Sequence, residues 1–300
     1  MIHFKSIAEM HNANGYPSPE NPMISLLYCN QQCDLGRTEF TGDFYMIAFK
    51  KMKSGDFLYG RTIYDSDQGS MFFTRPRQVI QMRNVELEES GFAIYFHEDL
   101  LHGHSLHKEI EKYTFFDYEV REALHLSPNE ESVVWELYSK IDNESKNNQD
   151  EFSRDIMLSH IDSILKYSQR FYKRQFINRN MLTGKVVSKF NHMLQGYYNN
   201  LDSVGLPSVK FLADELNMSP RYLSDLLKAE SGKTAIELIH IFLISEAKNK
   251  LMIEDTTIGE TAYALGFENL PYFSRLFKKE TGISPNQYKK QGIHAQRNVA

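Results

Sequence analysis

The chain has 300 residues, a length typical of about two domains when one domain takes roughly 100–200 residues. Hydrophobic residues at 41% and charged residues at 24% describe an ordinary soluble globular protein that can bury a core. No apolar run approaches the roughly 18 residues that a membrane span needs, and the first residues lack the apolar core of a signal peptide. We therefore expect a cytoplasmic protein with no membrane partner.

The two cysteines and the charge distribution exclude further classes. Cys29 and Cys33 form one C-x3-C pair, which cannot complete a four-ligand zinc site and is too small for a disulfide scaffold. The net charge of −5 hides an asymmetry, because residues 181–300 hold 14 Lys+Arg and 12 Asp+Glu while residues 1–180 hold 20 and 27. The C-terminal part is less basic than a strong non-specific nucleic-acid binder. If it binds DNA, geometry must supply more than bulk charge does.

Residues 20 to about 100 have the pattern of short strands. Runs rich in aromatic and β-branched residues alternate with polar turn segments that include "GRTEFTGD", "RPR" and "ESG"; the runs are "ISLLY", "DFYMIAFK", "FLYGRTI", "SMFFT", "VIQM" and "FAIYF". Many short strands at near-regular spacing predict a small sandwich or barrel.

From about Glu109 the pattern becomes helical. Ser127 is a predicted cap with Pro128 at the first helical position, and the polar stretch 142–150 is expected to end that helix. In the next helix, apolar residues recur at helical spacing; they are Phe152, Ile156, Ile161, Ile164, Leu165 and Tyr172. This stripe is either core or one half of a helix pair between two copies of the chain.

Two stretches beginning at Ser208 and Thr256 follow the same pattern. Each has a hydroxyl cap, a short helix with a central alanine (Ala213, Ala262), a tight turn, and a second helix that ends at a glycine. In the second helices the apolar residues fall on one face; they are Leu223, Leu226 and Leu227, then Phe273, Leu276 and Phe277. The pattern predicts two helix-turn-helix units; the alternative is two hairpins that only pack a bundle.

The second stretch explains why Gly266 and Pro271 lie so close together. Gly266 is expected to end the short helix where the chain reverses, Asn269 to cap the next helix, and Pro271 to lie in its first turn. Between the stretches, residues 234–255 read as one helix of roughly 30 Å at about 1.5 Å per residue. Successive major grooves lie about 34 Å apart, so such a helix could hold two recognition helices in adjacent grooves.

The closing segment "ALGFENLPYFSRLFKKETGISPNQYKK" is similar, almost residue by residue, to the signature of the arabinose-operon regulator (AraC/XylS) family of bacterial transcription factors. The resemblance covers residues 185–290 and implies two helix-turn-helix units bridged by a long helix. "GSMFFTRPRQVIQM" and "SGFAIYFHEDLL" resemble, more loosely, the sensor domain of that family, a small cupin-type β-barrel followed by dimerising helices.

The resemblance implies an α+β chain with a cupin-like sensor domain at residues 1–150, a helical linker and dimerisation segment at 151–180, and an all-α DNA-binding domain at 181–300. The implied function is that of a sequence-specific DNA-binding transcription regulator, an activator, and not an enzyme. The implied partners are promoter DNA, a second copy of the chain in a homodimer, a small-molecule effector and RNA polymerase. No cofactor or metal is expected.

The resemblance also places the DNA contacts, carried over position by position. The predicted set is Ser219, Arg221, Tyr222, Ser224, Asp225, Lys228, Leu270, Pro271, Ser274, Arg275, Lys278 and Lys279. Arg221 and Arg275 could each pair with guanine, and Tyr222, Lys278 and Lys279 are expected to contact phosphates. Asp225 replaces a residue that is usually basic: it either accepts from cytosine N4 or pairs with Lys228 on a solvated face.

Two predictions concern the N-terminal half. The aromatic and basic residues expected to line an effector pocket are Tyr45, Tyr59, Phe72, Arg77 and Tyr95. His102, His104 and Glu109 have the H-x-H-x4-E spacing of metal-binding cupin enzymes, which makes a metal-dependent enzyme with a helical appendage the alternative function. A glycine is missing where that motif would have one, at Phe96, and no second histidine motif follows. A protein-binding helical module is a third reading, and it predicts no affinity for DNA.

Overall fold

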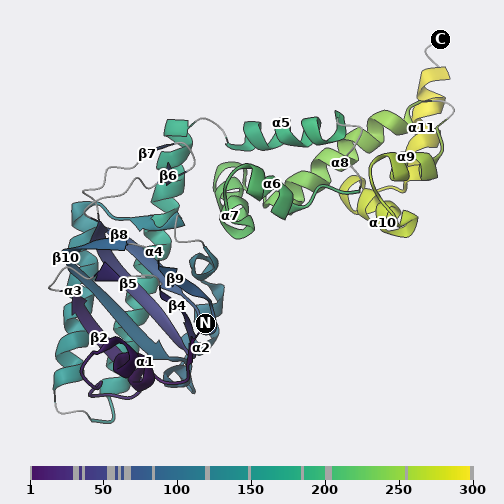
Figure 1. The fold of residues 1–300 in the computed structure, drawn as a ribbon. Helices are drawn as coiled ribbons and strands as arrows, with labels where there is room; N and C mark the ends of the chain where they lie inside the picture. The colour runs from purple at the N-terminus through teal and green to yellow at the C-terminus, as the bar shows by residue number, and fades with distance from the viewer. Residues whose placement is uncertain are drawn as a thin grey trace. The chain divides into compact units, whose positions relative to one another are not determined.

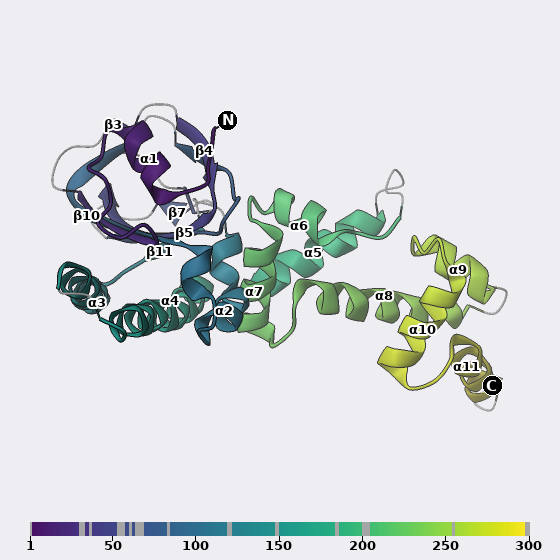
Figure 2. The same ribbon diagram turned by 90° about the horizontal axis from the view of Figure 1, so that it is seen from below.

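The chain divides into two compact units, residues 1–178 and 179–300, called here the N-terminal and C-terminal units. Figures 1 and 2 show the elements of each unit. The computed structural model describes residues 2–29, 34–35, 38–52, 58–59, 62–63, 69–82, 85–118, 122–147, 150–183, 186–199, 205–253 and 256–297. In this part of the chain no helix is both long and apolar enough to cross a membrane.

Strands of the N-terminal unit form a six-stranded, a three-stranded and a two-stranded sheet. The first has the order β11-β8-β5-β10-β2 with β3 also paired to β10, the second the order β1-β4-β9, and the third pairs β6 with β7. Among the described strands, β1 and β4 pair in parallel and all other pairs are antiparallel. The strands are β1 Ile2–Phe4, β2 Ile24–Cys29, β3 Asp34–Leu35, β4 Thr38–Gly42, β5 Phe44–Met52, β6 Leu58–Tyr59, β7 Thr62–Ile63, β8 Ser70–Thr74, β9 Ile80–Met82, β10 Val85–His97 and β11 Leu124–His125.

From Phe44 to Phe49, strand β5 is buried on both faces, which explains why this part of the strand has no charged residue. Because side chains alternate along a strand, Phe44, Met46 and Ala48 point into a core shared with β1, β4, β10 and helix α1 (Ile7–Asn14). Tyr45 and Phe49 point to the other face, where Phe49 meets Trp135 of helix α3 edge-on at 5.7 Å. The six-stranded sheet is thus packed between two apolar layers.

The expected closed barrel is not seen among the described strands. No pairing there joins the three-stranded sheet to the six-stranded sheet; they share an apolar core instead. Two expected turn segments were also wrong: "GRTEFTGD" contains β4, and "ESG" lies inside β10. At that point β10 shifts register between Leu87 and Gly91, and a Cβ on Gly91 would lie 2.7 Å from the Phe49 carbonyl oxygen. The glycine therefore permits a close strand approach and does not end the strand.

Two long helices complete the N-terminal unit, α3 (Pro128–Lys146) and α4 (Ser153–Thr183). Ser127 caps α3 as predicted, and the backbone N–H of Ser127 donates a hydrogen bond to the Glu130 carboxylate at 2.9 Å. The predicted stripe on α4 is only partly core. Its four C-terminal members are buried, whereas Phe152 is 62% and Ile156 40% exposed, because the buried face of the first turns instead carries Met157 and Leu158.

In the C-terminal unit the described residues form seven helices joined by short connections. Helix α8 contacts α5, α7, α9, α10 and α11, so it is the element around which the others pack. The helices are α5 Val186–Asn199, α6 Val209–Glu215, α7 Pro220–Ser231, α8 Ala235–Leu251, α9 Ile258–Ala264, α10 Leu270–Thr281 and α11 Pro285–Arg297. The α+β class is confirmed in this coarse form, a mixed N-terminal unit and a helical C-terminal unit.

Candidate nucleic-acid interface

Helices α6 and α7 form one helix-turn-helix, called the first motif, and α9 and α10 form the second motif. The two turns have matching hydrogen bonds. The Met218 amide donates to the Ala213 carbonyl at 2.9 Å, and the Phe267 amide donates to the Ala262 carbonyl at 3.0 Å. Both alanines are fully buried, because a larger side chain would separate the two helices of each motif. The predicted tight turns after central alanines are confirmed.

Each turn needs one residue with left-handed backbone, Asn217 at φ 53° and Gly266 at φ 83°. Asparagine and glycine tolerate this conformation better than other residues. Gly266 has a second constraint, since a Cβ there would lie 2.3 Å from the carbonyl oxygen of Gly205. Only glycine fits this turn.

The ends of the second helices follow the predictions as well. The Ser219 hydroxyl accepts from the Tyr222 amide at 3.3 Å, and the Asn269 side chain accepts from the Tyr272 amide at 2.9 Å. At the other end, Gly232 and Gly282 have positive φ, and their amides donate to the carbonyls of Lys228 and Lys278, each four residues earlier. The six apolar residues predicted to face inward are at most 5% exposed. Local sequence therefore specifies where α7 and α10 begin, which face they bury and where they end.

Helix α8 lies between the two motifs, and Figure 2 shows them near its two ends. It begins at Ala235, after a cap in which Thr234 and Glu237 bond reciprocally, and its 17 residues span about 25 Å. It is therefore shorter than the roughly 30 Å expected from residues 234–255. Burial lowers the pKa of His240 on this helix, Lys279 of α10 lowers it further, and Glu280 and Glu237 act in the opposite direction.

Helix α5, in the C-terminal unit, also reaches the second motif, a contact that was not predicted from the sequence. The Tyr198 hydroxyl donates to the Leu265 carbonyl in the turn of that motif at 3.2 Å, and its ring stacks on Phe242 of α8 at 5.6 Å. Burial raises the pKa of the Tyr198 hydroxyl. Two adjacent tyrosines at the end of an amphipathic helix were the available signal, but nothing in their spacing points to residue 265.

The outer face of α10 carries three exposed basic side chains, Arg275, Lys278 and Lys279. In the described part of the chain, no ion pair or side-chain hydrogen bond engages Arg275 or Lys278. Pro271 is exposed and Leu270 and Ser274 are partly exposed, so all six residues predicted on this helix reach the surface. Tyr272, which the sequence analysis left out, is 40% exposed beside them.

On the outer face of α7, more of the polar side chains interact with other groups of the protein. Arg221 lies 3.8 Å from Asp225 across one helical turn, so Arg221 is one partner of Asp225, and the ion pairs found among the described residues do not include the alternative pair with Lys228. Ser224 accepts a hydrogen bond from the Ala235 amide at 3.3 Å, which satisfies an amide at the start of α8. Lys228 is exposed.

Two of the predicted DNA contacts on α7 have buried side chains, which argues against a role for them at the surface. Tyr222 is fully buried, and Ser219 is 5% exposed because its hydroxyl is turned toward the helix it caps. The sequence could not distinguish Tyr222 from Tyr272, which follow their caps at the same distance. Their surroundings differ because α5 packs on α7, whereas α11 packs on α10.

The predicted effector residues of the N-terminal unit do not come together. Tyr95 and Phe72 lie at the core between the sheets, whereas Tyr45 lies on the opposite face of its strand, stacked on Phe96 at 5.1 Å. The structure does not describe the side chains of Tyr59 and Cys29, and Cys33 lies outside the described residues. The described aromatic candidates are therefore divided between the two faces of the sheet.

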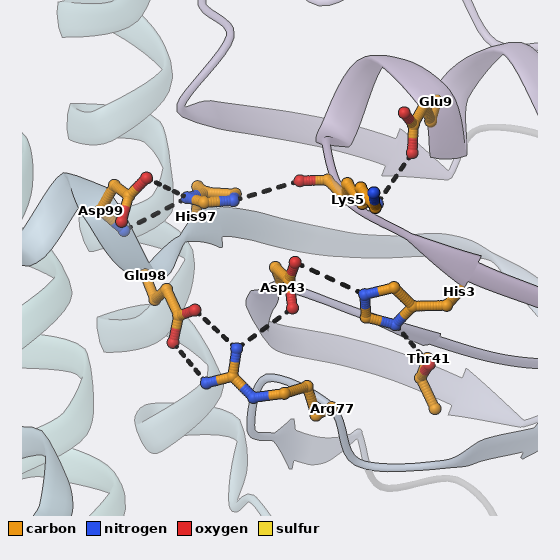
Figure 3. A network of polar contacts seen from close by, with 9 residues as sticks. All are labelled: His3, Lys5, Glu9, Thr41, Asp43, Arg77, His97, Glu98 and Asp99. Atoms are coloured by element: carbon orange, nitrogen blue, oxygen red, sulfur yellow. Dashed lines mark hydrogen bonds and ion pairs between the residues drawn. The ribbon is translucent and has the colours of Figure 1, made fainter.

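Arg77 belongs to a surface network instead (Figure 3). Its guanidinium forms two hydrogen bonds to Glu98, at 2.6 and 2.7 Å, and one to Asp43 at 3.1 Å. The Arg77 pairing lowers the pKa of the Glu98 carboxyl. On its far side, Asp43 approaches His3 of β1 at 3.4 Å. Figure 3 shows these side chains tying β1 to the sheet, which is a structural role.

The histidine-rich segment does not form the metal site of the alternative function. Glu109 pairs with Lys112 at 2.6 Å, His102 lies 3.6 Å from Asp99, and His104 accepts from the Leu106 amide at 3.1 Å. Among the described residues, no three His, Cys, Asp or Glu side chains are grouped so that they could hold a metal ion. The cupin-enzyme reading finds no support here.

Comparison with known proteins matches residues 212–291 to a family described as a helix-turn-helix domain. An uncharacterized HTH-type transcriptional regulator of Bacillus subtilis, YobQ, is 37% identical over 82 residues, covering 27% of this chain and 34% of that protein. The bifunctional transcriptional activator/DNA repair enzyme AdaA of the same organism is 34% identical over 82 residues, covering 39% of its length. The chain thus spans little more than a third of these relatives.

Other similarities reach further or are structural. The B. subtilis regulator YfiF is 22% identical over 253 residues, covering 82% of this chain and 76% of that protein. Among solved structures, the C-terminal domain of the response regulator AraT from Geobacillus stearothermophilus is 32% identical, with a TM-score of 0.31, and covers 35% of this chain and 84% of that one. Residues 212–291 therefore carry an AraC-type helix-turn-helix domain, and in this region the chain is similar to transcription regulators.

Proposed function

We propose that this protein is a sequence-specific transcription regulator that binds two successive major grooves of duplex DNA with α7 and α10. The observation that carries the proposal is the duplicated motif. Two helices with matched caps, turns and buried faces each present an outer face, and α10 presents three exposed basic residues there. A helix that only packed a bundle would need no such face.

The spacing of the two motifs supports binding to adjacent grooves. Helix α8 spans about 25 Å, and α7 and α10 pack against it from the two motifs. Successive major grooves on one side of B-DNA lie about 34 Å apart, so the widths of the motifs must supply the remainder. The Tyr198 contact and the approach of Gly205 to Gly266 favour a fixed arrangement of the two motifs.

Within the interface we assign roles by exposure and chemistry. Arg275 is the proposed base reader, since a guanidinium can pair with guanine O6 and N7. Lys228, Lys278 and Lys279 are proposed phosphate contacts, which position the protein without specifying sequence. Leu270 and Pro271 can offer apolar contact to a thymine methyl group, and Ser274 can bond to either base or phosphate.

The N-terminal unit is proposed as the sensor domain, a cupin-like barrel over residues 1–150 in the finer form of the prediction. Phe72 and Tyr95 stay as candidate effector contacts because they share the core between the sheets. An effector would change DNA binding only through different affinities for two arrangements of the protein. We propose an activator, without enzymatic activity, that contacts RNA polymerase and works in the cytoplasm.

Dimerisation through residues 151–180 is a proposal supported by exposed apolar residues on α4. Phe152, Ile156, Tyr167 and Ile177 are between 38% and 62% exposed. At about 100° per residue their four positions fall within an arc of about 80° around the helix, so they lie along one face. A second copy of α4 would cover this face.

Selection of bound sites from random duplex DNA with the full chain tests the function. The proposal predicts two short selected elements about 10 base pairs apart, one for each motif. Binding should weaken steeply with salt, because phosphate contacts release counterions. Recovery of no preferred sequence at any salt concentration would refute sequence-specific binding, and the protein-binding alternative would then account better for the exposed faces.

A further inference from the structure

The two recognition helices share a scaffold but not an outer face. Their caps, Ser219 and Asn269, lie 50 residues apart, as do their terminal glycines, so each position of α7 has a counterpart in α10. On the outer face Lys228 corresponds to Lys278, but Asp225 corresponds to Arg275. The two helices therefore correspond in backbone position and differ in the charge of their outer faces.

Charge favours α10 as the helix that approaches DNA most closely. Helix α7 carries Arg221 and Lys228 with two acidic residues, a net charge of zero; α10 carries three basic residues with one acidic residue, a net charge of +2. A carboxylate on a DNA-facing helix is repelled by phosphates, and each basic side chain that neutralises a phosphate adds affinity by counterion release. The net charge of α10 is therefore two units more positive than that of α7, although the two helices have matched caps and ends.

The contacts that these side chains make inside the protein also favour α10 as the base-reading helix. Arg221 has Asp225 within 3.8 Å, and the Ser224 hydroxyl is engaged by the amide of Ala235. Arg221, Ser224 and Asp225 are the polar residues of the first motif that could contact bases. Arg221 and Ser224 already have interaction partners inside the protein. Arg275 has no ion pair in the described part of the chain, and so it can turn to a base without losing a partner.

We infer that the second motif supplies the base readout and most of the affinity, and that Asp225 restricts the first motif to a supporting contact. This inference rests on the proposed DNA-binding function and adds to it a division of labour. The site that specifies sequence is then the face of α10 around Arg275, and its ligand is a guanine in the major groove. The first motif fixes register on the sugar-phosphate backbone.

The test measures the affinity of the full chain for a duplex carrying both selected elements, with single-base variants of each, at several salt concentrations. Arg275→Ala should weaken binding roughly 5- to 150-fold and remove the preference at one base pair. Arg221→Ala should weaken it less than about 3-fold with the preferences intact. In the matched pair, Lys278→Ala should cost more affinity than Lys228→Ala. All four side chains are exposed, so loss of fold is not expected, and circular dichroism checks this.

Asp225→Arg is the most informative variant, because it places on α7 the residue that α10 carries. Tighter binding, with a salt dependence steeper by about one unit, is the expected result. Asp225→Asn keeps the shape and removes the charge, and should bind as tightly as the parent or more tightly. Weaker binding of Asp225→Asn with a lost preference for cytosine would overturn the inference, because Asp225 would then be a base reader.

Further outcomes separate the inference from the function on which it rests. Equal losses for Arg221→Ala and Arg275→Ala, each at its own base pair, would overturn the division of labour and leave the proposed function standing. Absence of sequence-selective binding by the parent chain would overturn both.

Discussion

The first and second motifs have nearly the same backbone and different side chains. Their turn hydrogen bonds agree to 0.1 Å, at 2.9 and 3.0 Å, although one turn uses asparagine and the other glycine. The buried face of α7 consists of three leucines and Tyr222, and that of α10 consists of two phenylalanines and one leucine. The difference teaches that scaffold and surface are specified by separate residues, so the outer face can change charge while the motif stays intact.

The largest expected effect tests whether both scaffolds depend on their buried faces. Phe277→Ala removes a fully buried ring and should destabilise the second motif by about 3–5 kcal/mol, and Leu227→Ala should destabilise the first by about 2–5 kcal/mol. Amide hydrogen exchange measures each motif separately. A loss under about 1 kcal/mol at either site would show that its core does not hold that motif.

The two turns should respond differently to alanine. Gly266→Ala forces a left-handed alanine, which costs about 1–2 kcal/mol, and its Cβ also collides with the Gly205 carbonyl. Asn217→Ala brings the backbone cost alone, and Asn217→Gly serves as the tolerated control. Urea unfolding followed by circular dichroism checks the order of the three variants. Equal losses for Gly266→Ala and Asn217→Ala would refute the contact with Gly205.

The two caps should contribute similarly. Ser219→Ala and Asn269→Ala each leave an amide of the first helical turn without its side-chain acceptor and should cost about 1 kcal/mol. Faster exchange of the Tyr222 and Tyr272 amides, respectively, is the direct measurement. If neither amide exchanges faster, the capping assignment is wrong.

The smallest expected effect is a pH dependence of stability that comes from His240 of α8. Because burial lowers the pKa of His240, the unfolded chain binds the proton more readily than the folded one near its ordinary value of about 6.5. Stability near α10 should therefore fall as pH is lowered from 7 through that window, and His240→Gln should remove this slope. The measurement is the urea midpoint at several pH values; an unchanged slope in the variant would contradict the assignment.

Local features of the fold could be predicted from the sequence, and long-range ones could not. The caps at Ser127 and Asn269 and the turn at Gly266 depend on residues within one or two helical turns, and the structure confirms them. The parallel pairing of β1 with β4 joins segments 38 residues apart and carries no local signal. For the candidate interface, the sequence placed α10 correctly but could not show that α5 packs on α7, where Tyr222 is buried.

Methylation interference at guanine N7 shows whether the second motif reads sequence. Methylation blocks the acceptor that an arginine uses in the major groove. We expect strong interference at a guanine in the element under α10, weak interference in the other element, and loss of the strong signal in Arg275→Ala. Equal interference in both elements, or a strong signal that persists in Arg275→Ala, would contradict this expectation.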